Sequence, residues 1–255
     1  MTDASTLFRL DEQIVLITGG GTGLGLACGE LMVSAGARVA LVGRRERELH
    51  DAAERIGNGA IALPADVTRA EDRSSILQRC CDTFGKPGVL VHAAGIHLKR
   101  PAVDTSPELM NGVLQTHLCA AFELSRLWMD TRDDGVKGSI VFVGSMAAIL
   151  GIPLVAAYTA AKGAVSSLTR ALATEWAPRN VRVNCVTPGW IETPMLRAAM
   201  DNDPQRKSRV LTRTPLARFG EPQDIAAAVL YLTSPAAAFV TGANLVIDGG
   251  ASVGF

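Results

Sequence analysis

Two residues with complementary proton chemistry, Tyr158 and Lys162, are four positions apart in an alanine-rich stretch of the sequence. If that stretch is helical, both side chains lie on one face of the helix and present their polar ends to the same point. A free tyrosine, with a pKa of about 10, is a poor base at neutral pH, but a neighbouring ammonium group favours the phenolate and lowers this pKa. The spacing therefore indicates general acid–base chemistry. The alternative interpretation is an ordinary half-buried tyrosine beside a solvated lysine.

The segment Thr18–Gly25 is rich in glycine and follows directly after the apolar run Ile14–Thr18. Glycines at such a place allow a tight turn and a close approach of the backbone to a pyrophosphate, and the N-terminus of a following helix attracts the anion. The spacing departs from G-x-G-x-x-G because Leu26 occupies the place of the last glycine. It fits T-G-x-x-x-G-x-G instead, which predicts a phosphate-binding loop. The alternative is a flexible turn between a strand and a helix.

Short apolar runs rich in valine and isoleucine alternate with longer amphipathic stretches along the chain. The predicted strands are Ile14–Thr18, Arg38–Val42, Ala60–Leu63, Val89–Ala93, Ser139–Val143, Val181–Val186 and Asn244–Ile247. The predicted helices are Gly23–Ala35, Glu46–Ile56, Arg69–Phe84, Pro107–Asp130, Ala156–Trp176 and Asp224–Thr233. Continuous apolar runs suit parallel strands covered on both faces, and the alternation implies right-handed crossovers. We therefore expect an α/β fold with ligands at the carboxyl ends of the strands.

The composition narrows the class of protein. The chain has 255 residues, of which 48% are hydrophobic and 20% charged, so it can bury a sizeable core. Lys and Arg number 25 and so do Asp and Glu, which gives no basic excess and no reason to expect a nucleic-acid partner. The five cysteines lack C-x-x-C spacing, which favours neither a metal site nor a disulfide framework. Without a signal-peptide pattern or a long apolar run, we expect a cytoplasmic protein with no membrane partner.

Further motifs occur in an order that resembles the short-chain dehydrogenase/reductase family along nearly the whole chain. Besides the glycine loop, they are Asp66-Val67, Ser145 with Tyr158 and Lys162, Asn184 with Pro188-Gly189 and Thr193, and Asp248-Gly249-Gly250. Ser145 precedes Tyr158 by 13 positions, the usual distance in that family. The resemblance implies one Rossmann domain over residues 1–255, with a doubly wound, seven-stranded parallel sheet flanked by helices. It also implies an oxidoreductase that acts on a CH–OH group with NAD(P).

The same resemblance implies roles for individual residues. Tyr158 is the catalytic acid or base, Lys162 lowers its pKa and holds the nicotinamide ribose, and Ser145 orients the substrate. The positions implied around the cofactor are Thr18, Gly19, Gly21, Thr22, Gly23, Leu24, Gly25, Arg44, Arg45, Asp66, Val67, Ala93, Ala94, Gly95, Tyr158, Lys162, Pro188, Gly189, Ile191 and Thr193. A substrate lid is expected at about residues 190–215, and no metal ligand is implied.

Two places depart from the family pattern. Where the family has Asn-Asn-Ala-Gly after the fourth strand, this chain has His92-Ala93-Ala94-Gly95, which keeps the small residues and loses both amides. His117 replaces an asparagine that in the family helps to hold a water molecule linking the lysine to solvent. An imidazole can donate and accept hydrogen bonds and has an unperturbed pKa of about 6.5, so His117 is a candidate for the same catalytic relay. The alternative is a packing residue.

The residues that follow the second strand bear on the choice of cofactor. Gly43 stands where an acidic residue would bind the ribose 2′-hydroxyl of NAD, and Arg44 and Arg45 follow it. Arginine at this place accommodates the 2′-phosphate of NADP. We therefore expect NADP, with NAD as the alternative if Arg44–Glu48 is only a solvated helix start.

The substrate is less well defined by the sequence. The segments 96–102, 175–177 and 213–222 look most like those of gluconate 5-dehydrogenase-type sugar-acid dehydrogenases, although the last also recurs in 3-oxoacyl carrier-protein reductases. Basic residues in the loops expected at the site would attract an anionic substrate, or they belong to a solvated lid surface that Asp201 and Asp203 partly balance. These basic residues are Lys99, Arg100, Arg197, Arg206, Lys207, Arg209 and Arg213.

The expected activity is therefore hydride transfer between nicotinamide and a secondary alcohol or ketone. A sugar acid such as gluconate is the first substrate candidate, and a 3-oxoacyl thioester or another ketone is the alternative. A catalytically inactive, nucleotide-binding regulatory protein is the alternative from another class, against which the intact Ser145, Tyr158 and Lys162 argue. The resemblance also implies a homotetramer or homodimer built on the helices Pro107–Asp130 and Ala156–Trp176 and the C-terminal strand.

Overall fold

The computed structural model describes residues 4–133, 135–200 and 204–254, without the side chains of residues 4, 5, 198, 199 and 206. Its frame is a parallel sheet of seven strands. The strands are β1 (Ile14–Thr18), β2 (Arg38–Gly43), β3 (Ala60–Pro64), β4 (Val89–His92), β5 (Gly138–Val143), β6 (Val181–Pro188) and β7 (Asn244–Ile247). Their order across the sheet, β3-β2-β1-β4-β5-β6-β7, is that of a doubly wound Rossmann fold, which confirms the predicted fold class.

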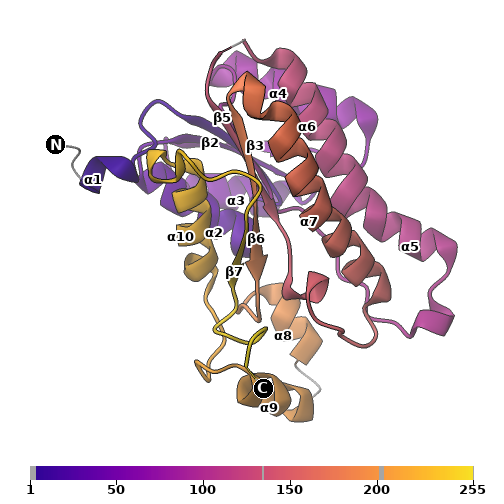
Figure 1. Ribbon diagram of the computed structural model, residues 1–255. Helices are drawn as coiled ribbons and strands as arrows, with labels where there is room; N and C mark the ends of the chain where they lie inside the picture. The colour runs from indigo at the N-terminus through magenta and orange to yellow at the C-terminus, as the bar shows by residue number, and fades with distance from the viewer. Residues whose placement is uncertain (1–3, 134, 201–203, 255) are drawn as a thin grey trace.

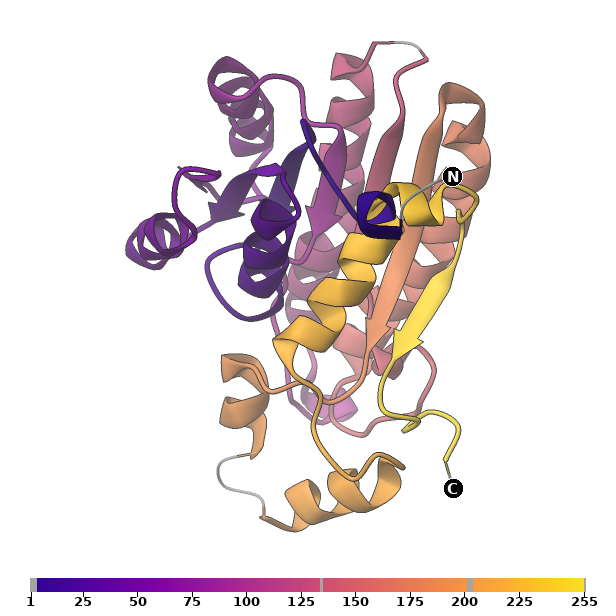
Figure 2. The same cartoon turned by 90° about the vertical axis from the view of Figure 1, so that its left-hand side faces the viewer.

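Helices cover both faces of this sheet (Figures 1 and 2). The α-helices are α1 (Ala4–Leu7), α2 (Gly23–Ser34), α3 (Glu46–Ile56), α4 (Ala70–Thr83), α5 (Pro107–Leu114), α6 (Ala120–Thr131), α7 (Ala156–Trp176), α8 (Pro194–Met200), α9 (Pro204–Arg213) and α10 (Pro222–Thr233). Helices α2, α3 and α10 pack on one face of the sheet, and α4, α6 and α7 pack on the other. Strand β1 shows how one run serves both layers, because Val15 and Ile17 enter the first core whereas Ile14 and Leu16 enter the second.

Several helical segments differ from the sequence predictions, among them α1, which the sequence did not indicate. The helix predicted over Pro107–Asp130 is interrupted between α5 and α6 by a π-helical turn, Gln115–Cys119. Helix α10 begins at Pro222, before the predicted Asp224, because proline suits a first turn and Asp224 Oδ2 accepts from the Glu221 N–H at 2.8 Å. Helices α8 and α9 form within the stretch for which the sequence indicated only a lid.

The carboxyl ends of the strands all meet at one edge of the sheet, the lower edge in Figure 1, and α8 and α9 lie beyond it in both views. The chain winds outward from β1 to β3 and then returns to β4, which pairs with the other side of β1. A ligand is expected at this switch point, outside the ends of β1 and β4. No helix of the described residues is both long and apolar enough to cross a membrane.

Candidate active site

Two adjoining cavities open at the carboxyl edge of the sheet. The first, the glycine-loop cavity, has a volume of about 370 Å³ and extends from the glycine loop and Arg44 to Tyr158 and Lys162. The second, the Ser145 cavity, has a volume of about 140 Å³, and its wall includes Ser145, Tyr158 and Trp190. Tyr158 belongs to both walls and therefore stands where the cavities meet.

Most positions expected around the cofactor lie together. Those that line the glycine-loop cavity are Gly19, Gly21, Thr22, Gly23, Leu24, Gly25, Arg44, Arg45, Asp66, Val67, Ala93, Ala94, Gly95, Tyr158, Lys162 and Thr193. Pro188, Gly189 and Ile191 line the Ser145 cavity, where Thr193 also contributes. Thr18 lies behind the first wall, and its Oγ1 accepts a hydrogen bond from the Ala94 N–H at 3.2 Å. Thr18 thus joins the loops that follow β1 and β4.

The backbone conformation and close packing of the glycine loop favour glycine. Gly19 has a φ of +72°, and a Cβ there would lie 2.8 Å from the carbonyl carbon of Ala93. A Cβ at Gly25 would overlap the carbonyl oxygen of Gly19. The turn is therefore tight and packs closely on the neighbouring loop, while the first turn of α2 faces the cavity with its free N–H groups. These residues fit a dinucleotide whose pyrophosphate meets the start of α2.

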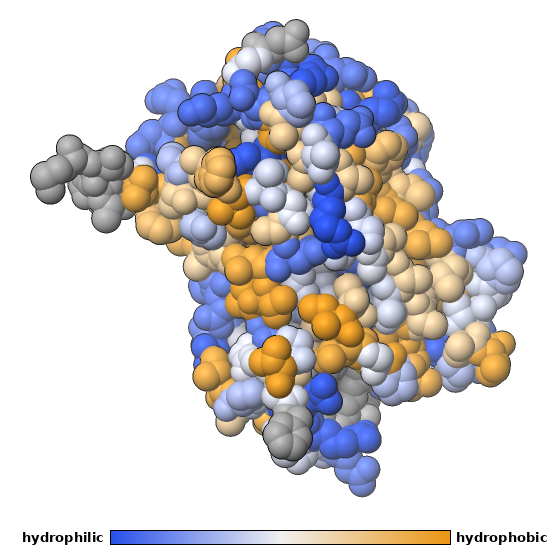
Figure 3. All heavy atoms as spheres, viewed as in Figure 1, coloured by the Kyte–Doolittle hydropathy of each residue, from blue (hydrophilic) through white to orange (hydrophobic). Residues whose placement is uncertain are grey.

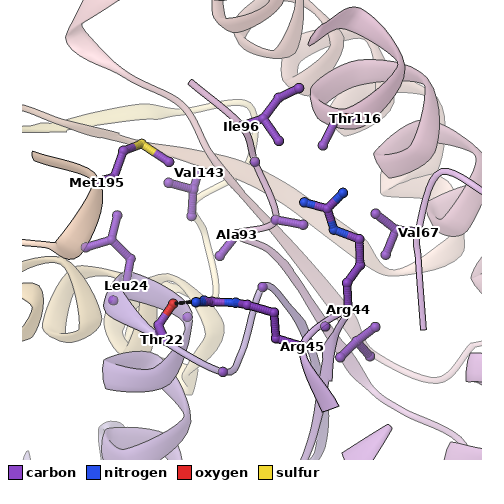
Figure 4. A pocket seen from close by; sticks show the side chains of 18 of the residues that line it. Thr22, Leu24, Arg44, Arg45, Val67, Ala93, Ile96, Thr116, Val143 and Met195 are labelled. Atoms are coloured by element: carbon purple, nitrogen blue, oxygen red, sulfur yellow. Dashed lines mark hydrogen bonds between the residues drawn. The ribbon is translucent and has the colours of Figure 1, made fainter. Parts of the chain in front are cut away.

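Two arginines, Arg44 and Arg45, line the end of the glycine-loop cavity that lies across from Met195 in Figure 4. Arg44 extends into the cavity with its Nη1 4.0 Å from Asp66 Oδ2, whereas Arg45 Nη2 donates to Thr22 Oγ1 at 2.9 Å. Burial alone would raise the pKa of Asp66, but hydrogen bonds from Thr68 and the charge of Arg44 bring this pKa below its usual value. This end of the cavity therefore combines an ionised carboxylate with two guanidinium groups.

Ser145 and Tyr158 line the same cavity, and the Ser145 hydroxyl lies close enough to the phenol to influence its pKa. Ser145 lies just beyond β5, and its Oγ accepts from the Ala147 N–H at 3.1 Å, which orients the hydroxyl. Tyr158 lies in the first turn of α7. Burial raises the pKa of Tyr158, and the nearby Ser145 hydroxyl offsets this only in part, so the phenol is protonated at neutral pH.

Lys162 lies one turn along α7, as predicted, but its ammonium group has another partner. Lys162 Nζ donates to the carbonyl oxygen of Val143 at 2.6 Å and is 5.5 Å from the centroid of the Tyr158 ring. Burial lowers the pKa of Lys162 to about 8. Burial is the main influence on the pKa of the Tyr158 phenol, while the ammonium group of Lys162 is bound to a backbone carbonyl. That Lys162 lowers the pKa of Tyr158 therefore stays a prediction.

His117 lies in the π-helical turn and packs edge-on against Tyr158, with 5.3 Å between ring centroids and 86° between the planes. Its Nε2 is 2.8 Å from the carbonyl oxygen and 3.1 Å from the nitrogen of Ile96. A Cβ at Gly95 would overlap the imidazole, which explains the glycine. Burial, together with the charge of Lys162, lowers the pKa of His117 to about 3. His117 is therefore neutral at physiological pH, in contrast to the unperturbed value assumed from the sequence.

His92, the other departure from the family pattern, is a core residue. Its Nε2 lies 2.8 Å from Ser125 Oγ on α6, and its ring stacks on Phe142 with 4.9 Å between centroids. Burial lowers the pKa of His92 to about 3. Its neutral imidazole links β4 to α6.

The segment expected to form a lid is held together at its base. The Gly220 N–H donates to the Trp190 carbonyl oxygen at 2.9 Å, and the Glu192 N–H donates to the Gly220 carbonyl oxygen at 2.8 Å. From α8, Met195 and Leu196 contribute to the wall of the Ser145 cavity. The basic residues expected at its mouth do not line it, as far as they are described: Lys99, Arg100, Arg197, Lys207, Arg209 and Arg213. The side chain of Arg206, and Asp201 and Asp203, lie outside the described residues.

Sequence reasoning missed His97, which lines the Ser145 cavity. Its ring lies 5.4 Å from that of Tyr158, centroid to centroid, at an angle of 61°. The signal available was its position two residues after Gly95, in the loop that follows a central strand. In the sequence this histidine was only part of a segment resembling sugar-acid dehydrogenases.

Comparison with known proteins agrees with this geometry. The sequence model of a family described as enoyl-(acyl carrier protein) reductase matches residues 19–252. Galactitol 2-dehydrogenase (L-tagatose-forming) of Cereibacter sphaeroides is 39% identical over 98% of this chain and 99% of its own length. The protein 2-(S)-hydroxypropyl-CoM dehydrogenase 3 of Xanthobacter autotrophicus is 38% identical over 95% of this chain and 97% of its own length. Among solved structures, a gluconate 5-dehydrogenase from Burkholderia cenocepacia in complex with NADP and tartrate is similar to this chain. The two structures superpose with a TM-score of 0.93 at 29% sequence identity, and the match covers 99% of this chain and 100% of that chain.

Proposed function

The chain belongs to the short-chain dehydrogenase/reductase family, and we propose that it transfers a hydride between NADP and a neutral secondary alcohol or ketone. Its class, an oxidoreductase that acts on CH–OH groups, is that of relatives named as dehydrogenases. The observation that carries the proposal is the meeting of Ser145, Tyr158 and Lys162 where the two cavities join.

A bound nicotinamide supplies or accepts the hydride, and the chain's own residues handle the proton. A substrate oxygen in the Ser145 cavity would accept hydrogen bonds from Ser145 and Tyr158. Because burial raises the pKa of Tyr158, its hydroxyl keeps a proton that it can donate to a developing alkoxide. Lys162, with a pKa of about 8, is charged at neutral pH and stabilises the phenolate that remains.

His117 is placed to hold a water molecule of a proton relay behind Lys162 while its imidazole stays neutral. The short contact of Nε2 with the Ile96 carbonyl favours the tautomer that donates from Nε2, which leaves Nδ1 as an acceptor. Nδ1 is buried without a partner among the described residues, and His117 and Lys162 both line a small cavity of about 10 Å³. This volume is at the lower limit for one water molecule. Such a water could connect Nδ1 to Lys162, as the family's asparagine-bound water does.

Arg44 and Arg45 support NADP over NAD. Both line the glycine-loop cavity, and Gly43, the last residue of β2, offers no carboxylate for a ribose 2′-hydroxyl. A 2′-phosphate is stabilised by charge-assisted hydrogen bonds from guanidinium groups. The similar structure of the gluconate 5-dehydrogenase from Burkholderia cenocepacia contains bound NADP.

The lining of the Ser145 cavity supports a neutral substrate. Among the described residues of this wall there is no Lys, Arg, Asp or Glu, and most side chains are apolar. The larger apolar members are Met146, Ile152, Val155, Trp190, Ile191, Met195 and Leu196. A carboxylate placed there would lose hydration without gaining an ion pair.

A sugar acid is the second candidate, and a specific contact supports it. The Arg100 N–H donates to the Leu154 carbonyl oxygen at 2.7 Å, which places Lys99 and Arg100 beside residues 152–155 at the rim of the cavity. An extended substrate could keep its carboxylate at this rim while its reacting carbon reached Tyr158. The similarity to a gluconate 5-dehydrogenase favours the same candidate.

We also propose that residues 190–215 are the substrate lid of a single domain and that the protein forms a homodimer or homotetramer. The hydrogen bonds between the segments of Trp190 and Gly220 support the lid, because α8 and α9 protrude between them beyond the sheet (Figure 2) and α8 adds Met195 and Leu196 to the cavity wall. Phe122 on α6 and Val246 on β7 are exposed, and Figure 3 shows hydrophobic side chains on the face of the molecule that includes these elements. These elements include those expected at a subunit interface, and sedimentation velocity would measure the assembly.

The function is tested by following NADPH and NADH oxidation with cyclohexanone, a ketogluconate and an acetoacetyl thioester. We expect cyclohexanone to be reduced, and faster with NADPH than with NADH. Preferential reduction of the ketogluconate would favour the sugar-acid candidate. NADPH binding without turnover of any compound would favour a regulatory protein instead.

A further inference from the structure

A further cavity, the Asp248 cavity, adjoins the Ser145 cavity and takes no part in the proton chemistry. Its volume is about 140 Å³, the same as that of the Ser145 cavity. The charged groups of its wall already have partners, because Arg218 Nη1 lies 3.2 Å from Asp224 Oδ2 and the Asp248 carboxylate accepts from two backbone N–H groups at 2.7 and 2.8 Å. The Asp248 cavity therefore adds space for a neutral group rather than for an ion.

Two residues, Trp190 and Ile191, belong to the walls of both cavities. Ile191 is part of the hydrophobic core and is 6% exposed. Its side chain packs against Gly220, where a Cβ would lie 2.6 Å from Ile191 Cδ1. Trp190, in contrast, is only partly buried. Trp190 is therefore the residue shared by the two walls whose side chain is not committed to the core.

The backbone of Trp190 is held in place on both sides. The Trp190 carbonyl oxygen accepts from the Gly220 N–H at 2.9 Å, and a Cβ at the preceding Gly189 would lie 2.6 Å from the Cα of Asp248. The indole Nε1 is buried and has no hydrogen-bond partner among the described residues. The ring therefore stands at a fixed place in the wall and acts there through its bulk.

We propose that Trp190 is a specificity-determining residue that closes the Ser145 cavity toward the Asp248 cavity, so that the enzyme prefers compact ketones and secondary alcohols to bulky ones. This inference rests on the proposed function and names the size class of the substrate for the same site. Without the indole, the two cavities would join into one space of about twice the volume. A bulky neutral group could then extend past residue 190 while the carbonyl stayed at Tyr158.

The test compares kcat/KM with NADPH for cyclohexanone and for its 3- and 4-tert-butyl derivatives, which share the reacting ring and differ in bulk. We expect the parent to prefer cyclohexanone. In Trp190→Ala, at least one bulky ketone should gain about tenfold or more relative to cyclohexanone, since one methylene in an apolar pocket is worth about 10- to 200-fold. In Trp190→Phe, which keeps an aromatic ring and removes the unpaired N–H, the preference should stay close to that of the parent.

Ile152→Ala is the matched control, because Ile152 is an apolar residue that lines the Ser145 cavity and not the Asp248 cavity. It should change the preference less than Trp190→Ala does. An equal change would overturn the inference, since any enlargement of the site would then admit the bulky ketones. Binding of NADPH, measured by its fluorescence, shows that each variant is folded. Trp190→Leu takes the place of Trp190→Ala if the alanine variant does not bind NADPH.

A purely structural role for Trp190 would lower the rates with all three ketones together and leave their ratio unchanged, which would overturn the inference while the proposed function stood. A parent enzyme that reduced the bulky ketones as well as cyclohexanone would do the same. Failure of the parent to reduce cyclohexanone or any other neutral ketone would contradict the proposed function and this inference with it.

Discussion

The ammonium group of Lys162 donates a 2.6 Å hydrogen bond to the carbonyl oxygen of Val143, the last residue of β5. This bond links α7 to the central sheet at the point where the two cavities meet. It also gives the ammonium group a hydrogen-bond acceptor, although Lys162 is only 5% exposed. Burial nevertheless lowers the pKa of Lys162 to about 8. The lysine is therefore charged at neutral pH but close to losing its proton.

The first prediction concerns stability against pH. The unfolded lysine keeps its proton up to about pH 10.5, whereas the folded lysine loses it at about 8. The unfolded state therefore binds more protons within this window, so Lys162 should make the free energy of unfolding rise with pH there. Urea unfolding of the parent and of Lys162→Met between pH 7 and 9.5 measures this effect. We expect the parent to gain stability relative to the variant above pH 8, and a constant difference would contradict the lowered pKa.

The second prediction concerns His117. Because burial and the charge of Lys162 lower the pKa of His117 to about 3, its titration should not enter the rate between pH 5 and 8. Turnover measured against pH should give curves of the same shape for the parent and for His117→Asn. An inflection at about pH 6.5 that only the parent showed would mean that the imidazole becomes charged during the reaction.

The third prediction concerns the choice of cofactor. Arg44→Asp should repel a 2′-phosphate and accept from a 2′-hydroxyl, so the preference for NADPH over NADH should fall about tenfold, the effect of losing one charge-assisted contact. Arg47→Asp is the matched control, since Arg47 is exposed in the first turn of α3, shortly after Arg44 in the chain, pairs with Asp51 at 3.9 Å and does not line the cavity. The measurement is the ratio of kcat/KM for the two cofactors. A similar change in both variants would show that only the net charge of the surface matters.

The sequence was sufficient for the frame of the site and for its main residues. Apolar runs predicted the strands because the central ones are buried on both faces, and the spacing of Tyr158 and Lys162 predicted one helix face. The glycine loop could be placed because Gly19 and Gly25 have no room for a Cβ.

The features that sequence reasoning missed depend on tertiary packing. The π-helical turn at Gln115–Cys119 keeps the same apolar pattern as an α-helix, so periodicity does not reveal it. The partner of Lys162 is a backbone carbonyl, which carries no sequence signal. The pKa of His117 is set by burial under the loop of Ile96, which neighbours along the chain do not indicate.

The most direct test of the central claim is turnover by Tyr158→Phe. This change removes the proton donor that meets Ser145 at the junction of the cavities and keeps the ring that packs against His117. We predict that turnover falls by at least ~10²-fold, the lower end for general acid–base catalysis, while NADPH still binds. Turnover within a few-fold of the parent would contradict the assignment of Tyr158 as the acid and base.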